Sequence, residues 1–162
     1  MRARLPTDPL ERMTEHLREA AACRTPPRFS GPLLGEVDLA ATPAAVRVAR
    51  SYIRALVAER HPGAALDDLT LVTSEVVTNA IVHARPCPGG TILLTVAHSG
   101  GRLHVEVTDG GPGDTGPPPL PADLPDLGGR GLHLVEALTT AHGTRRNPDG
   151  TATSWFELHL GA

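Results

Sequence analysis

Residues 71–84 read LVTSEVVTNAIVHA, a stretch that combines an apolar helical pattern with three evenly spaced polar side chains. Glu75, Asn79 and His83 are four residues apart, so in a helix they stack on one face. Asn is a poor residue for a helix interior. A carboxylate, an amide and an imidazole that project together favour a site for a metal and a nucleotide. An exposed Glu and an incidental Asn are the alternative explanation of this segment alone.

The composition of the whole chain narrows the class of protein. The chain has 162 residues and a net charge of −3, which fits one domain with its own core and excludes a basic surface for nucleic acid or acidic membranes. All 15 cationic residues are arginine, which excludes a lysine-dependent phosphate loop of the Walker type. No apolar run reaches membrane-spanning length, and the N-terminus has no signal-peptide core. We therefore expect a cytoplasmic protein that binds neither nucleic acid nor a membrane.

The two cysteines, Cys23 and Cys87, do not suggest a disulfide framework, because a single pair is too few. Reduced cysteines agree with a cytoplasmic protein. His83 and Cys87 are four residues apart, but prolines on both sides of Cys87 break the helix, and no second pair stands at zinc spacing. We expect reduced cysteines and no structural zinc.

The pattern along the chain predicts one domain at 31–162, preceded by an extension and linker at 1–30. The elements expected in the domain are strands at 33–40, 91–98, 102–109 and 152–160, and helices from 43 to about 60, at 66–84 and at 131–141. Thr42 is the expected N-cap of the first of these helices. The order β-α-α-β-β-loop-α-β predicts an α/β two-layer sandwich, with a mixed, mostly antiparallel sheet and the helices on one face.

The first glycine-rich segment, DGGPG, follows directly on a predicted strand. Asp109 could accept a hydrogen bond from an exocyclic amino group such as that of adenine. Gly111 and Gly113 would let the backbone bend and approach a ligand closely. A plain turn is the alternative, because Asp-Gly is a strong turn dipeptide.

The second segment, GGRG at 128–131, opens a predicted helix. Free N–H groups and the helix dipole favour phosphate there, and Arg130 adds a positive charge; a flexible helix entry is the alternative. Between the two segments, residues 110–128 are too rich in Gly and Pro for regular structure, and so long a loop is usually functional. Its GPGDTG at 111–116 spells the dinucleotide fingerprint, but prolines follow where the fingerprint requires a helix, which excludes a Rossmann site.

Taken in order, these three segments resemble the motifs of the GHKL ATPase superfamily, which includes gyrase and the histidine kinases. The family's boxes are E-x-x-x-N, D-x-G-x-G and G-x-G-L, and the matching residues are Glu75 and Asn79, then Asp109, Gly111 and Gly113, then Gly129, Gly131 and Leu132. The loop at 114–128 stands where the family has its ATP lid. The resemblance covers residues 33–160 and implies the Bergerat ATP-binding fold.

The resemblance also implies that the chain binds ATP and Mg²⁺. Asn79 would hold the metal, Glu75 would be the catalytic base for an attacking hydroxyl, and Asp109 would contact the adenine amino group. The other candidate ATP-binding residues are His83, Gly111, Gly113, Gly129, Arg130, Gly131, Leu132 and Thr153. Among them, the turn before the last predicted helix would cradle the phosphates and Thr153 would lie on the adenine side.

Within the superfamily, the chain is similar to the small anti-sigma-factor kinases and their regulatory relatives in high-GC bacteria. This implies a protein-serine kinase that binds a sigma factor, phosphorylates an anti-anti-sigma partner and forms a homodimer. The alternative is a non-catalytic module that binds partners in response to ATP and regulates transcription. Glu75 favours the kinase, because a pure binder needs no base. The loop at 114–128 favours the binder, because it is acidic and has no Arg or Lys.

Overall fold

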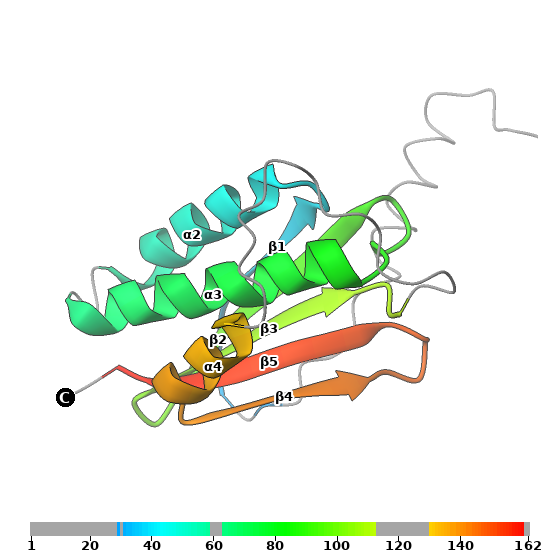
Figure 1. Ribbon diagram of the computed structural model, residues 1–162. Helices are drawn as coiled ribbons and strands as arrows, with labels where there is room; N and C mark the ends of the chain where they lie inside the picture. The colour runs from blue at the N-terminus through cyan, green and yellow to red at the C-terminus, as the bar shows by residue number, and fades with distance from the viewer. Residues whose placement is uncertain (1–28, 30, 59–62, 113–129, 161–162) are drawn as a thin grey trace, which may run out of the picture.

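The structure, a computed structural model, describes residues 29, 31–58, 63–112 and 130–160. These residues form two layers, a five-stranded sheet with helices packed on one of its faces (Figure 1). The predicted α/β two-layer sandwich is therefore confirmed. The extension at 1–30 lies almost wholly outside the described residues, so the domain boundary near residue 31 stays a prediction.

The elements follow one another in the order β1 (Leu33–Ala40), α2 (Ala44–Val57), α3 (Ala64–His83), β2 (Thr91–Ser99), β3 (Arg102–Asp109), α4 (Arg130–Leu138), β4 (Ala141–Arg146) and β5 (Ala152–His159). The strand order across the sheet is β1-β2-β3-β5-β4. Every neighbouring pair of described strands is antiparallel. The expected mixed sheet is thus fully antiparallel within the described residues. At the start of α2 the cap position is Pro43, without a side-chain cap from Thr42.

β4 is not among the strands that the sequence predicts. The helix expected at 131–141 ends at Leu138, and the next segment pairs along its length with β5. β4 is an edge strand whose side chains are alternately half-buried and exposed. Its sequence AHGTRR has no large apolar residue, so it lacks the alternation by which a half-buried strand is recognised. This strand forms one wall of the site described below.

The core lies between the sheet and the helices. On β3, Leu103, Val105 and Val107 face the helices and are fully buried, and on β5 Phe156 does the same. α3 is the central helix, because it contacts α2, α4, β3 and β5. None of the described helices is long and apolar enough to cross a membrane.

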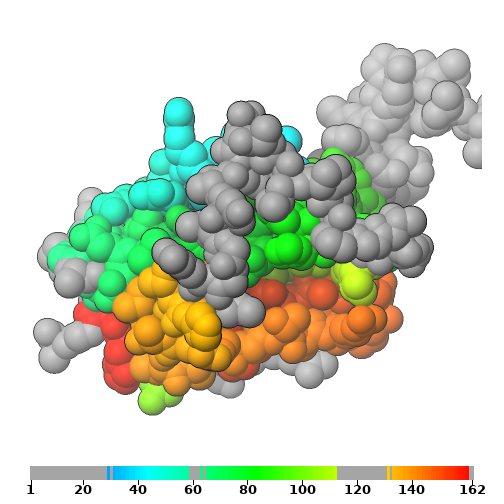
Figure 2. Space-filling model, viewed as in Figure 1, coloured from blue at the N-terminus to red at the C-terminus, as the bar shows by residue number. Residues whose placement is uncertain are grey.

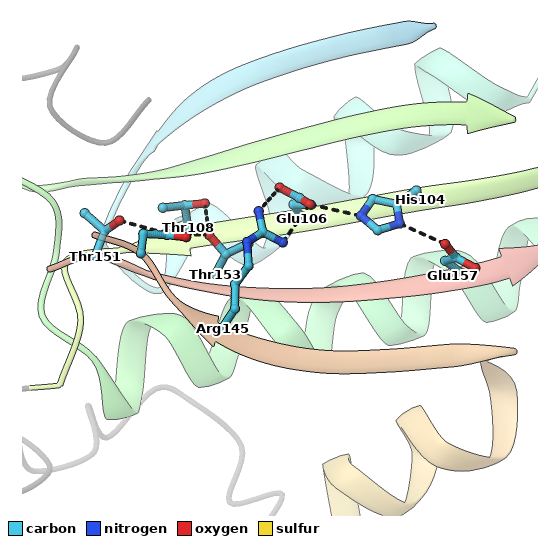
Figure 3. Close-up of polar contacts among 8 residues, drawn as sticks. His104, Glu106, Thr108, Arg145, Thr151, Thr153 and Glu157 are labelled. Atoms are coloured by element: carbon cyan, nitrogen blue, oxygen red, sulfur yellow. Dashed lines mark hydrogen bonds and ion pairs between the residues drawn. The ribbon is translucent and has the colours of Figure 1, made fainter. Parts of the chain in front are cut away.

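The opposite face of the sheet carries a network of charged residues (Figure 3). Arg145 of β4 donates two hydrogen bonds, of 2.9 and 2.8 Å, to the carboxylate of Glu106 on β3. The ring of His104 lies between Glu106, at 3.0 Å, and Glu157 of β5, at 3.2 Å. Burial alone would raise the pKa of Glu106, but the hydrogen bonds and charges of His104 and Arg145 hold it below its ordinary value. The network joins β3, β5 and β4 through their side chains.

Cys87 lies in the turn between α3 and β2, where it is 2% exposed and forms an isolated bridge with Thr91. It is disulfide-bonded. The expectation that both cysteines are reduced is therefore wrong for Cys87, because the sequence gives spacing along the chain and not proximity in space.

Candidate functional site

A cleft of about 390 Å³ lies between the C-terminal half of α3 and the ends of β3, β5 and β4. The space-filling view shows the elements around it, with α4 and the orange surface of β4 beside each other below the green surface of α3 (Figure 2). The lining residues from α3 and the following turn are Val76, Asn79, Ala80, His83 and Ala84. Asp109 and Gly111 also line the cleft, which therefore joins the polar face of this helix to the first glycine-rich segment.

The polar stripe of α3 runs from the protein interior to solvent. Glu75 is buried, Asn79 is half-buried and His83 is exposed. Asn79 and His83 line the cleft, whereas Glu75 is not among its lining residues. The helix thus presents an amide oxygen and an imidazole to a ligand and keeps the carboxylate one turn further in.

Glu75 packs against the first turn of α4. A Cβ atom added to Gly131 would overlap the Glu75 Oε2 atom, so α4 approaches the carboxylate this closely because residue 131 is glycine. Glu75 is 4% exposed, and burial raises the pKa of its carboxyl group. A carboxylate with a raised pKa is a better proton acceptor near neutral pH than an exposed one.

Asp109, at the end of β3, provides a buried carboxylate at the cleft wall. It is 6% exposed, and its Oδ1 accepts a hydrogen bond of 2.7 Å from the N–H of Gly111. Burial raises the pKa of Asp109 to about 6, against the hydrogen bond from Gly111, which lowers it. Gly111 adopts a φ of 87° and lies against the carbonyl of Gly150, where a Cβ atom would not fit. The glycine therefore lets the backbone turn back and bond one oxygen of Asp109, and leaves the other available to a ligand.

Several predicted residues are outside the described part of the chain. Gly113 and Gly129 are not described. Arg130 and Leu132 belong to the first turn of α4, but their side chains lie outside the described residues. Their predicted contacts with phosphate therefore stay predictions.

Thr153 is not brought to the cleft. It is fully buried, and its hydroxyl lies 2.8 Å from the Thr108 hydroxyl and accepts a hydrogen bond of 2.9 Å from Asn147. The lining residues on β5 include its neighbours Ala152 and Ser154. Because alternate strand residues face opposite sides of the sheet, Thr153 points to the face that carries the charged network (Figure 3).

The wall contributed by β4 is the part of the site that sequence reasoning missed. Its lining residues are His142, Gly143, Thr144 and Arg146. They were missed because this segment carries no recognisable strand pattern. The signal that could have found them is the Arg-Arg pair ahead of an Asn-Pro-Asp-Gly turn, since such turns connect antiparallel strands.

The side chains that the structure describes do not form a metal site by themselves. Among the described residues, no group of three or more His, Cys, Asp and Glu could hold a metal ion. The cleft does offer the amide oxygen of Asn79. Mg²⁺ commonly takes one or two protein oxygens and completes its shell with waters and ligand phosphates. The donor set therefore fits Mg²⁺ carried with a polyphosphate.

The family model described as a histidine kinase-like ATPase domain matches residues 39–155. This range covers more than half of the chain and includes both walls of the cleft. No curated protein matches the chain. The resemblance to the GHKL superfamily is therefore confirmed, and its ATP-binding role applies to this domain. The chain belongs to the histidine kinase-like ATPase family.

Proposed function

We propose that this domain binds Mg-ATP as a regulatory protein and transfers the γ-phosphate to a serine of an anti-anti-sigma partner. The observation that carries the nucleotide part is the buried carboxylate of Asp109. One of its oxygens is held by Gly111, and the residue lines a cleft of about 390 Å³. A buried acceptor that lacks a full set of protein donors calls for a donor from the ligand.

The amino group of adenine supplies that donor. Both oxygens of a carboxyl group are acceptors only while the group is ionised, because protonation turns one of them into a donor. With a pKa of about 6, Asp109 is mostly ionised at pH 7.5. The apolar surfaces of the cleft, on the sheet and on the adjoining side of α3, suit a flat heterocycle. Ligand sites typically combine apolar walls with a few polar groups that fix the orientation of the ligand.

The phosphates would lie toward Asn79 and the start of α4. Asn79 would hold Mg²⁺ through its amide oxygen. The N–H groups at the start of α4 would face the phosphates, and Gly131 keeps the backbone there free of side chains. ATP would supply the phosphoryl group. The acidic, lysine-free loop at 114–128 leaves Arg130 as the cation nearest in sequence to this turn.

In the kinase hypothesis, Glu75 is the base. Its raised pKa suits acceptance of the proton from a serine hydroxyl as the hydroxyl oxygen attacks the γ-phosphorus. For this to happen, Glu75 must reach the cleft, and the first turn of α4 now lies against its carboxylate.

That contact favours the second candidate function, a non-catalytic module that binds partners in response to ATP. In such a protein the buried Glu75 would hold α4 and never meet a hydroxyl. Both functions share the proposed cytoplasmic localisation, the proposed partner (a sigma factor or an anti-anti-sigma protein) and the proposed homodimer. They differ only in phosphotransfer.

Calorimetry with ATP and Mg²⁺ tests the shared part. Asp109→Asn should abolish ATP binding, because an amide offers an N–H where the carboxylate accepts, whereas Glu136→Gln on the exposed face of α4 should bind as the wild type does. Unchanged affinity in the Asp109 variant would remove the adenine assignment.

Phosphotransfer from γ-labelled ATP to candidate anti-anti-sigma proteins of the same genome separates the two functions. The kinase hypothesis expects labelled serine with the wild type and none with Glu75→Gln, while both proteins bind ATP equally. Transfer at the native rate by the variant would exclude Glu75 as the base. Binding without transfer by the wild type would favour the module.

A further inference from the structure

The two arginines at the end of β4 point to opposite faces of the sheet. Arg145 faces the charged network, where it is bonded twice to Glu106. Arg146, the next residue, lines the cleft. Arg146 is exposed, and its side chain forms no ion pair or hydrogen bond with another described residue. One arginine is thus bound within the fold, and its neighbour is available to a ligand.

Arg146 stands across the cleft floor from Asp109. Ala152 of β5 is directly opposite Asp109 on one side and Arg146 on the other. Side chains that are directly opposite on neighbouring strands share a face, and two strand spacings separate the outer pair by about 10 Å between Cα atoms. Because the side chain of Ala152 ends at Cβ, the floor between the carboxylate and the guanidinium is open. A flat ring system fits there.

Arg146 and Asp109 lie at the end of the cleft that would hold the adenine ring. Asp109 lies at the C-terminal end of α3, since the N–H of Arg85, just after this helix, bonds the carbonyl of Gly111 at 2.9 Å. The expected phosphate end is marked by Gly131, which packs on Glu75. With a rise of about 1.5 Å per residue, Glu75 is roughly 15 Å along the helix from Arg85. Arg146 pairs across β5 with Asp109, so it lies at the adenine end of the cleft and not at the phosphate end.

We propose that Arg146 contacts the base of the bound adenine nucleotide and closes the open side of its pocket. This assignment rests on the proposed nucleotide binding and names a contact within it. A planar guanidinium stacks on aromatic rings and is weakly hydrated, which suits it to a half-open pocket. Asp109 would hold the amino edge of the ring while Arg146 lies against the ring from β4.

The test is an NMR titration of the full chain with adenosine, AMP and Mg-ATP, which covers weak and strong binding. Arg146→Ala should weaken all three ligands by the same factor, about fivefold to tenfold. Arg146→Lys should recover only part of the loss, because an ammonium does not stack as a guanidinium does. Arg50→Ala, which removes an exposed arginine of α2 away from the cleft, should change no affinity.

Two results would overturn the assignment. A loss confined to AMP and Mg-ATP, fully restored by lysine and reduced at high salt, would make Arg146 a phosphate ligand. Unchanged affinities for all three ligands would make it an ordinary surface residue. Failure of the wild type to bind any of the three would refute the nucleotide function itself, which is a separate result because it is seen before any variant is made.

Discussion

Asp109→Asn should stabilise the unliganded protein in a pH-dependent manner. The ordinary pKa of this carboxyl is 3.8, and burial raises it to about 6 in the folded protein. The folded state therefore prefers the protonated form, and the stability that this preference contributes is lost as the pH rises from 3.8 through 6. One pKa unit corresponds to about 1.4 kcal/mol, so ionisation of Asp109 costs the wild type about 3 kcal/mol well above pH 6. Asparagine carries no charge, and its Oδ1 can still accept from Gly111.

The assay is urea unfolding without nucleotide at pH 4.5 and 7.5. By the same linkage relation, the cost of ionisation is about 1 kcal/mol at pH 4.5 and about 3 kcal/mol at pH 7.5. The advantage of the variant over the wild type should therefore grow by about 2 kcal/mol between the two pH values. All other titrating groups cancel in this difference. Glu136→Gln is the matched control, because the side chain of Glu136 is 63% exposed, and its difference from the wild type should be the same at both pH values. An Asp109 difference that does not change with pH would refute the reasoning.

Three further predictions concern the packing around the site. Arg145→Met should destabilise the fold by about 3 kcal/mol, because it leaves Glu106 buried and short of a partner, whereas Arg54→Met, at an exposed ion pair, should cost less than about 1 kcal/mol in the same urea titration. Gly131→Ala should lower the free energy of unfolding by about 1–3 kcal/mol, because the added methyl group overlaps Glu75. Combining it with Glu75→Ala should remove this cost. A rise in the free energy of unfolding, which alanine in place of glycine usually gives in a helix, would contradict the contact. Thr153→Val should leave the ATP affinity unchanged and cost about 1–2 kcal/mol of stability, and a selective loss of ATP binding would show that its hydroxyl reaches the ligand.

The sequence predicts the elements of this fold where the apolar period is strong. α3 and the hairpin of β2 and β3 are found close to their predicted bounds, because their buried faces are continuous runs of aliphatic residues. β4 is missed because an edge strand buries too little to need such a pattern. The two sides of the cleft are therefore not equally predictable. The helix side follows from an apolar period that is visible in the sequence, whereas the β4 side depends on pairing with β5, which is not.

Thr153 shows a second limit of sequence reasoning. Which face of β5 meets the core depends on whether Trp155 or Phe156 points inward, and both are apolar. The structure buries Phe156 completely and leaves Trp155 half-buried, so Thr153 lies on the face of β5 opposite Phe156 and is not among the residues that line the cleft. A shift of the strand by one residue moves every side chain to the other face of the sheet. The sequence alone therefore does not determine which face of β5 meets the core.

The turn between β4 and β5 decides which arginine meets a ligand. It is closed by hydrogen bonds between Asn147 and Thr151 and from Gly150 to Asn147, with Gly150 at a φ of 87°. Lengthening this connection by one residue could slide β4 by one position and exchange the environments of the two neighbouring guanidinium groups. Engineers who graft loops onto this scaffold, or who compare relatives with turns of different length, should therefore treat the residue count of this hairpin as a determinant of ligand preference.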